Sequence, residues 1–152
     1  MTLAFHRAAV RDIPAETLYR LLWLRVAVFV VEQEAAYPEL DGRDIEPGAE
    51  LLWAEEDGEV LATLRLLVDG EAGPARIGRV ATAPPARGRG LAADLMRMAV
   101  DRAGERWPVR DIVLDAQEHL AGWYARFGFA ISGPGFVEDD IPHVPMRRAA
   151  SV

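Results

Sequence analysis

The sequence predicts a single α/β domain of the α+β kind, in which helices cover the faces of one mixed sheet. Strand-like and helix-like stretches follow one another in the order β, α, β, β, β, α, β, α, β, β, the pattern of a sheet flanked by helices. The length of 152 residues fits one compact domain, spanning 1–152. With 51% hydrophobic and 27% charged residues, the composition is that of an ordered globular protein.

The N-terminal third is predicted to hold a strand, a helix and a long loop. Leu3 to Val10 forms the strand, and Asp12 with Pro14 gives the start signals of a helix. Its apolar stripe consists of Leu18, Leu21, Leu22 and Val26. The run Val26 to Val31 lacks helical spacing, so helix and strand both remain open there. Glu34 to Gly48 is acidic and rich in Pro and Gly, which indicates a long loop of the kind that is usually functional or mobile.

The rest of the chain is predicted to supply most of the sheet. Glu56-Asp57-Gly58-Glu59 has the composition of a tight turn, so the runs on either side should form a hairpin. The expected strands are Leu51 to Glu55, Val60 to Val68, Arg76 to Thr82, Asp111 to Ala116, Phe129 to Ile131 and Val144 to Arg147. A helix should begin at Gly90 and end between Gly104 and Pro108, and a shorter one should run from Leu120 to Phe127.

Composition disfavours several classes of function. The formal net charge of −7 argues against nucleic acid as the main partner, because such binding relies on Lys and Arg. The absence of cysteine excludes a disulfide framework, a thiolate zinc site and a cysteine nucleophile, and no metal site is predicted. No apolar run approaches the roughly 18 residues of a membrane span, and residues 1–11 lack a signal-peptide pattern. A cytoplasmic protein with neither nucleic-acid nor membrane partners is expected.

A glycine-rich loop between a strand and a helix carries the functional prediction. Arg87-Gly88-Arg89-Gly90-Leu91-Ala92 stands between the strand ending at Thr82 and the next helix. The first N–H groups of a helix are unpaired and its dipole is positive there, which favours an anionic pyrophosphate. Small residues allow the phosphates to approach the main chain. The alternative is an ordinary turn that enters a helix; the motifs of nucleotide-triphosphate and dinucleotide loops are absent.

The loop resembles the acetyl-CoA-binding motif of the GNAT N-acetyltransferase superfamily, Gln/Arg-x-x-Gly-x-Gly/Ala, through Arg87, Gly90 and Ala92. A second element of that superfamily, Tyr-x-x-x-Gly-Phe, is matched by Tyr124 to Phe129. The resemblance implies a GNAT fold, with a mixed sheet of about six to seven strands and about four helices, and acetyl-CoA as the co-substrate. It assigns cofactor contacts to Val80, Ala81, Thr82, Arg87, Gly88, Arg89, Gly90, Leu91, Ala92, Ala93 and Gln117.

Nearly the whole chain is similar to the ElaA-like branch of this superfamily. The matching stretches are Arg25 to Gln33, Asp41 to Asp44, Ile77 to Val80, Ala116 to Leu120, Phe127 to Phe129 and Ile141 to His143. The resemblance implies transfer of an acyl group from acetyl-CoA to an amine of a small molecule or peptide, without fixing the acceptor. The acidic loop Glu34 to Glu50 weakly favours a cationic one.

Direct transfer to an amine requires an acid, a base and a donor for the carbonyl oxygen. Tyr124 is the candidate general acid, against the alternative of a core tyrosine packed beside Trp123 and Phe127. A main-chain N–H near Val80 or Ala81 is the candidate donor. The base is open between Glu32, His119 and His143.

The acceptor pocket is assigned to five residues. These are Arg25, Phe29, Arg65, Arg79 and His119. The three arginines interrupt apolar stretches and therefore need partners, for which Glu32, Asp41 and Asp44 are the candidates. Structural ion pairing around the pocket is favoured over direct contact with substrate.

The sequence leaves two alternative functions open, and it also leaves the oligomeric state open. Acyl-homoserine-lactone synthases share the fold, and Arg25, Phe29, Asp41, Asp44 and Arg65 are similar to their markers. However, the chain is short for that family and no tryptophan lies between Phe29 and Asp41. A non-catalytic acyl-CoA-binding module would also retain the loop. Edge strands of such domains often pair, so a homodimer is one assembly that the sequence allows.

Overall fold

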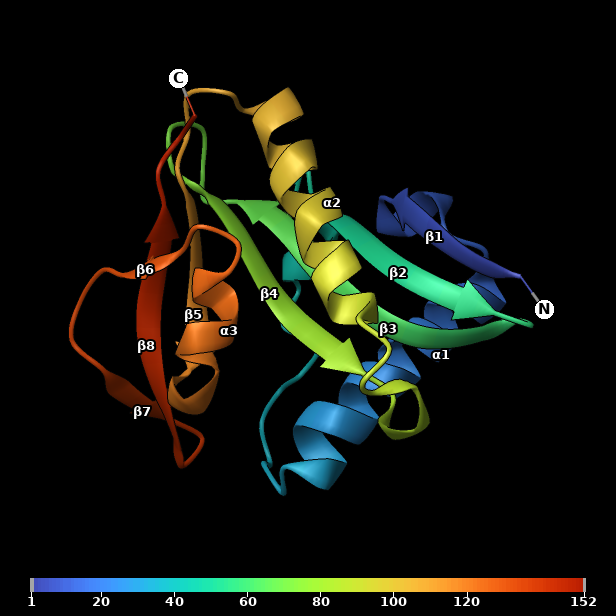
Figure 1. Cartoon of the computed structure of the whole chain (residues 1–152). Coiled ribbons are helices and arrows are strands. Elements are labelled where there is room, and N and C mark those ends of the chain that lie inside the picture. The colour runs from blue at the N-terminus through green and yellow to red at the C-terminus, as the bar shows by residue number, and fades with distance from the viewer. Residues whose placement is uncertain (1, 152) are drawn as a thin grey trace.

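Eight strands form one twisted sheet in the computed structural model, which describes residues 2–151 (Figure 1). The strands are β1 (Leu3–Ala8), β2 (Glu50–Glu56), β3 (Glu59–Val68), β4 (Ala75–Thr82), β5 (Ile112–Gln117), β6 (Ala130–Ile131), β7 (Phe136–Glu138) and β8 (Ile141–Arg148). Their order is β1-β2-β3-β4-β5-β8-β6, and β7 also pairs with β8. Only β4 and β5 run parallel among these pairs.

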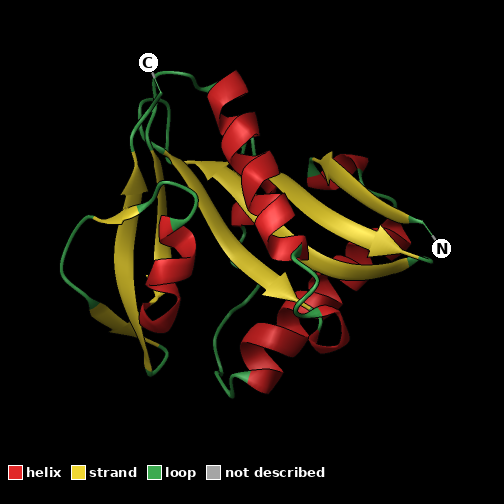
Figure 2. Ribbon diagram, in the orientation of Figure 1, coloured by secondary structure: helices red, strands yellow, loops and turns green. Residues whose placement is uncertain are grey.

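Residues 2–151 contain three α-helices. They are α1 (Ala15–Val26), α2 (Leu91–Arg106) and α3 (Ala121–Ala125). Helical segments, drawn red in Figure 2, lie on both faces of the sheet. Successive residues of a strand point to opposite faces. Accordingly, Leu51 and Trp53 of β2 pack with Leu21 of α1, whereas Leu52 of the same strand belongs to the core cluster that contains Leu95 of α2.

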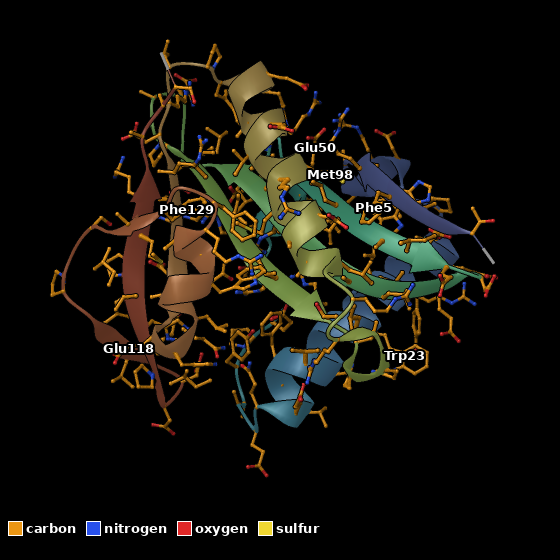
Figure 3. The ribbon with its side chains drawn as sticks, viewed as in Figure 1. Phe5, Trp23, Glu50, Met98, Glu118 and Phe129 are labelled. Carbon is orange, nitrogen blue, oxygen red and sulfur yellow. The ribbon has the colours of Figure 1, made fainter. Side chains whose placement is uncertain are left out.

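Short helical segments complete the chain. Val10–Asp12, Arg43–Ile45, Pro84–Ala86 and Glu118–Leu120 are 3-10 turns, and Ala27–Glu32 is a π-helix that extends α1. On α1 the large side chain of Trp23 points away from the sheet and is 66% exposed (Figure 3). None of the helices in residues 2–151 combines the length and apolarity needed to cross a bilayer.

The predicted fold class is confirmed, with corrections in detail. The hairpin between β2 and β3 turns at Asp57 and Gly58, whose φ values of 54° and 79° suit a tight turn of the primed type. The undecided run Val26 to Val31 continues the helix in π geometry. The sheet has eight strands instead of six or seven, because β7 was not predicted, and the described chain has three α-helices instead of about four.

Candidate active site

The parallel strands β4 and β5 part shortly after they begin, and the opening between them is the centre of the site. They pair only at Ala75 with Ile112 and at Arg76 with Val113. Figure 1 shows the two strands diverging below that point. The cleft has a volume of about 1060 Å³ and is lined from β4, β5, the π-helix, the loop before α2, α3 and the β7–β8 hairpin. Because β4 has no neighbour on this side, its main-chain groups are free to bind a ligand.

An extra residue in β4 decides which of those main-chain groups face the cleft. Arg65 of β3 pairs with Gly78 and Thr63 with Ala81, so two residues of β4, Arg79 and Val80, lie opposite the single residue Leu64 of β3, and Arg79 has a φ of 54°. Before this bulge the N–H of Ala75 donates to Asp111 O at 2.9 Å, on the β5 side.

After the bulge the alternation is reversed. The N–H of Ala83 donates to Leu61 O of β3 at 2.8 Å, and Ala81 pairs with Thr63. Since N–H groups alternate between the two sides of a strand, those of Val80 and Thr82 point into the cleft. Of the two candidate carbonyl donors, the geometry therefore favours Val80 over Ala81.

The glycine-rich loop opens onto the same cleft at the head of α2. Gly88 and Gly90 have φ values of 85° and 79°, and a Cβ added at either would meet nothing within 4 Å. The helix begins at Leu91 without a side-chain cap, so the N–H groups of its first turn are free for a ligand. This donor set suits a diphosphate. Of the predicted loop contacts all but Arg89 line the cleft, namely Arg87, Gly88, Gly90, Leu91, Ala92 and Ala93.

Both arginines of the loop are held by carboxylates of the chain itself. Arg87 makes a two-pronged ion pair with Glu32 at the end of the π-helix, with Nη1–Oε2 and Nη2–Oε1 distances of 2.8 and 2.6 Å. The hydrogen bond from Arg87 lowers the pKa of Glu32. Arg89 binds Glu56 of β2 in the same manner, at 3.3 and 3.1 Å. Glu32 thus connects the π-helix to the loop before α2, and the prediction that it pairs with Arg25, Arg65 or Arg79 is wrong.

Tyr124 lies in α3, on the side of the cleft formed by β5. It is 8% exposed, lines the cleft and packs edge-on against Trp123 with ring centroids 4.9 Å apart. Burial raises its pKa to about 12. Burial is the one cause of this shift, and no hydrogen bond from a group in residues 2–151 contributes to it, so the hydroxyl is available to a ligand in the cleft. The residue therefore both packs in the core and offers a free donor.

Two histidines and Gln117 lie at the end of β5. Gln117 pairs with His143 of β8, and both line the cleft together with His119. The Nδ1 of His143 is 2.7 Å from Ile141 O, so this nitrogen donates, and in the neutral ring Nε2 is then the acceptor. Its ring stacks on Phe136 at 5.6 Å. His143 is thus oriented as a base, whereas His119 has only its position in the cleft wall.

Three arginines and three carboxylates form an ionic network beside the cleft. Arg25 is 1% exposed and binds Glu39 and Asp44, each at 2.6 Å. Arg65 binds Asp41 at 2.9 and 3.1 Å, and reaches Asp44 at 3.4 Å. The predicted partners Asp41 and Asp44 are confirmed. Sequence reasoning missed Glu39, although its place in the acidic loop 14 residues after Arg25 was a usable signal.

The network fixes the irregular loop that carries its acids. Burial by itself would raise the pKa of Asp41, but hydrogen bonds from Arg65 and the Arg43 amide lower it to about 2. Asp41 and Arg65 line the cleft, as does Phe29, which packs with Val28 and Ala81. Arg25 is buried below them and does not line the cleft.

Farther along this wall Asp69 joins two more arginines. It accepts from Arg43 at 2.8 Å and from Arg76 at 2.8 Å. Arginines and acidic residues therefore alternate along this wall of the cleft. No group of three or more Asp, Glu or His within residues 2–151 is arranged to hold a metal ion.

Comparison with known proteins places this architecture among acetyltransferases. A family model described as an acetyltransferase (GNAT) domain matches residues 16–150. A UPF0039 protein of Mycobacterium bovis is 46% identical over 154 residues, which cover 99% of this chain and 96% of that protein. The protein ElaA of Escherichia coli is 36% identical over 138 residues, with 90% of each covered.

Solved structures agree. An acyl-CoA N-acyltransferase from Pseudomonas aeruginosa has a TM-score of 0.91 at 43% identity, with 97% of this chain and 100% of that chain covered. Escherichia coli ElaA has a TM-score of 0.91 at 32% identity, covering 97% and 99%. At 13% identity, an aminoglycoside 6'-N-acetyltransferase complexed with coenzyme A shares the fold, with a TM-score of 0.74 and 100% and 98% covered.

Proposed function

Because the chain belongs to the family of GNAT acetyltransferase domains, in its ElaA-like branch, we propose that it transfers an acetyl group from acetyl-CoA to a primary amine. The acceptor is an amine of a small molecule or a peptide. The observation that carries the proposal is the single cleft onto which the glycine-rich loop, the free edge of β4 and Tyr124 all open.

The cofactor half of the site is built from main-chain donors. The N–H groups from Gly88 to Ala93 are proposed to hold the diphosphate, with the charges of Arg87 and Arg89 beside them. The edge of β4 from Val80 to Thr82, together with Gln117 across the cleft, is proposed to hold the pantetheine arm. When bound, acetyl-CoA would supply a thioester carbonyl as the electrophile and a thiolate as the leaving group.

The residues of the chain have separate proposed roles in the transfer. The Val80 N–H stabilises negative charge on the carbonyl oxygen, where a preorganised donor is most effective. Tyr124 donates its proton to the departing sulfur, and with a pKa of about 12 it stays protonated at neutral pH.

A base must take the proton of the attacking amine. His143 is favoured, since its Nε2 is left as an acceptor, and a water molecule can extend its reach. Glu32 is the second candidate, but it must first leave Arg87, whose hydrogen bond lowers its pKa and its basicity. His119 is proposed to contact the acceptor.

The acceptor half is proposed to lie along the wall with alternating charges. Phe29 and the exposed parts of Arg65 and Arg79 line it, whereas Arg25 supports it from below. The arginines already have carboxylate partners, so their proposed role is to shape the pocket. Location in the cytoplasm and assembly as a homodimer remain proposals from the sequence, and light scattering tests the second.

The deciding experiment is a thiol-release assay with acetyl-CoA over a panel of amines. The panel should contain polyamines, amino sugars, arylamines, amino acids and peptide N-termini, with mass spectrometry of the products. An acetylated amine supports the proposal. Coenzyme A binding without turnover of any amine would favour a non-catalytic acyl-CoA-binding module, and a lactone formed from S-adenosylmethionine and an acyl donor would favour a homoserine-lactone synthase.

A further inference from the structure

Arg79 has a backbone conformation that its own side chain should disfavour. Its φ of 54° lies in the left-handed region, where Cβ crowds the following carbonyl, and glycine is the usual residue there. It is the extra residue of the β4 bulge. Some other interaction must therefore hold this conformation in place.

The side chain of Arg79 supplies that interaction. Its Nε donates to Glu39 Oε2 at 3.0 Å, and its Nη2 donates to Glu39 O at 3.2 Å and to Asp41 Oδ2 at 3.2 Å. The guanidinium also lies over the ring of Tyr37 at 5.5 Å. We call this set of contacts the Arg79 clamp.

The clamp is attached to points that are themselves fixed. Glu39 is 4% exposed and accepts from Arg25 of α1 at 2.6 Å. Asp41 accepts from Arg65 of β3 at 2.9 Å. Helix α1 and strand β3 thus determine where the guanidinium can lie, and a rigid guanidinium with several bonds restrains the backbone of its own residue.

We infer that Arg79 is a positioning residue, whose clamp holds the β4 bulge so that the Val80 N–H points into the cleft. The alternation of N–H directions along β4 supports this inference. Without the extra residue, the alternation that directs the N–H of Gly78 toward β3 would direct that of Val80 there as well. The inference rests on the proposed function, in which this N–H binds the acyl carbonyl oxygen.

A matched pair of variants separates positioning from direct contact. Arg79→Gly and Arg79→Ala both remove the guanidinium, but only alanine retains the penalty for a left-handed backbone. The readout is the infrared carbonyl band of bound acetyl-CoA labelled with carbon-13 in its acetyl group, together with kcat and the affinity for coenzyme A by calorimetry. A hydrogen bond to the carbonyl lowers the frequency of this band.

The positioning role predicts that glycine rescues what alanine loses. The band should shift in the wild type and in Arg79→Gly but not in Arg79→Ala, whose kcat should be about tenfold below that of the glycine variant. Affinity for coenzyme A should stay within about twofold in all three, because the loop before α2 is untouched. Arg79→Asn, whose residue type tolerates this conformation, should behave like Arg79→Gly and replaces it if that variant does not fold.

Each other outcome is decisive. Equal loss in the glycine and alanine variants would mean that the guanidinium itself contacts the substrate, and the positioning role would be wrong. If the carbonyl band of acetyl-CoA bound to Arg79→Ala shifts as much as in the wild type, the bulge persists without the clamp and the positioning role is wrong. If the wild-type band does not shift on binding, then the proposed carbonyl donor fails, and the inference fails with it.

Discussion

Replacement of Glu32 tests whether the cofactor and the protein compete for the same guanidinium. In the structure Arg87 is occupied by Glu32 in the two-pronged geometry that a phosphate would also use. Both side chains are 44% exposed, so the pair is a surface ion pair worth about 0.2–1 kcal/mol. If the diphosphate must displace the carboxylate, Glu32→Gln returns that energy. Coenzyme A should then bind up to about fivefold more tightly.

Isothermal titration of coenzyme A measures the effect. The gain should shrink at high ionic strength, where surface charges are screened. Glu34→Gln is the matched control, since it changes net charge equally and lies two residues farther along, outside the cleft lining. Weaker binding by Glu32→Gln would mean that the carboxylate orients Arg87 for the ligand, and the displacement argument would be refuted.

Three further predictions test the glycine-rich loop, the proposed general acid Tyr124 and the ionic network around Asp41. Gly90→Glu should weaken coenzyme A binding by roughly tenfold or more through charge and bulk; Gly90→Ala isolates the backbone cost of its positive φ, and unchanged affinity by calorimetry would contradict the phosphate-binding role. Tyr124→Phe should lower kcat by roughly ten- to a hundredfold, by a ratio constant from neutral pH to about pH 10 because the pKa is near 12; a variant as fast as wild type removes the general acid. Asp41→Asn should cost about 1–2 kcal/mol in the free energy of unfolding at neutral pH. Because the folded pKa lies below the ordinary 3.8, the loss should fade as pH falls through about 2, and chemical denaturation at several pH values that showed a constant difference would exclude this linkage.

The conformation of the loop that is proposed to hold the cofactor was predictable because its signals are local. The strand ending at Thr82, the glycines at 88 and 90 and the start of α2 are consecutive in sequence, and each has a conformational reason of its own. The hairpin at Asp57 and Gly58 was predictable on the same ground. Short-range turn chemistry fixes such segments regardless of what packs around them.

The wall that is proposed to hold the acceptor was only partly predictable: the acids Asp41 and Asp44 were expected as partners of its arginines, but its shape depends on contacts far apart in the chain. The bulge at Arg79 exists only in register with β3, and nothing in the residues around position 79 indicates it. Strand β7 consists of three exposed residues, so it has no burial pattern to detect. The run after Val26 is apolar and rich in β-branched valine, a composition that suits both helix and strand. Contacts with the rest of the fold therefore determine its conformation.

The loop before α2 and the acidic loop are attached to different parts of the fold, and this difference affects how the choice of acceptor can change. The arginines of the loop before α2 are paired with Glu32 of the π-helix and Glu56 of β2, and not with acids of the acidic loop, so the loop can hold the same cofactor whatever the acidic loop does. Glu39 and Asp41 instead connect the acidic loop to β4, where the proposed carbonyl donor lies. A change in the acidic loop that admits another amine must therefore keep the Arg79 clamp, or it will alter the geometry of the reaction together with its specificity.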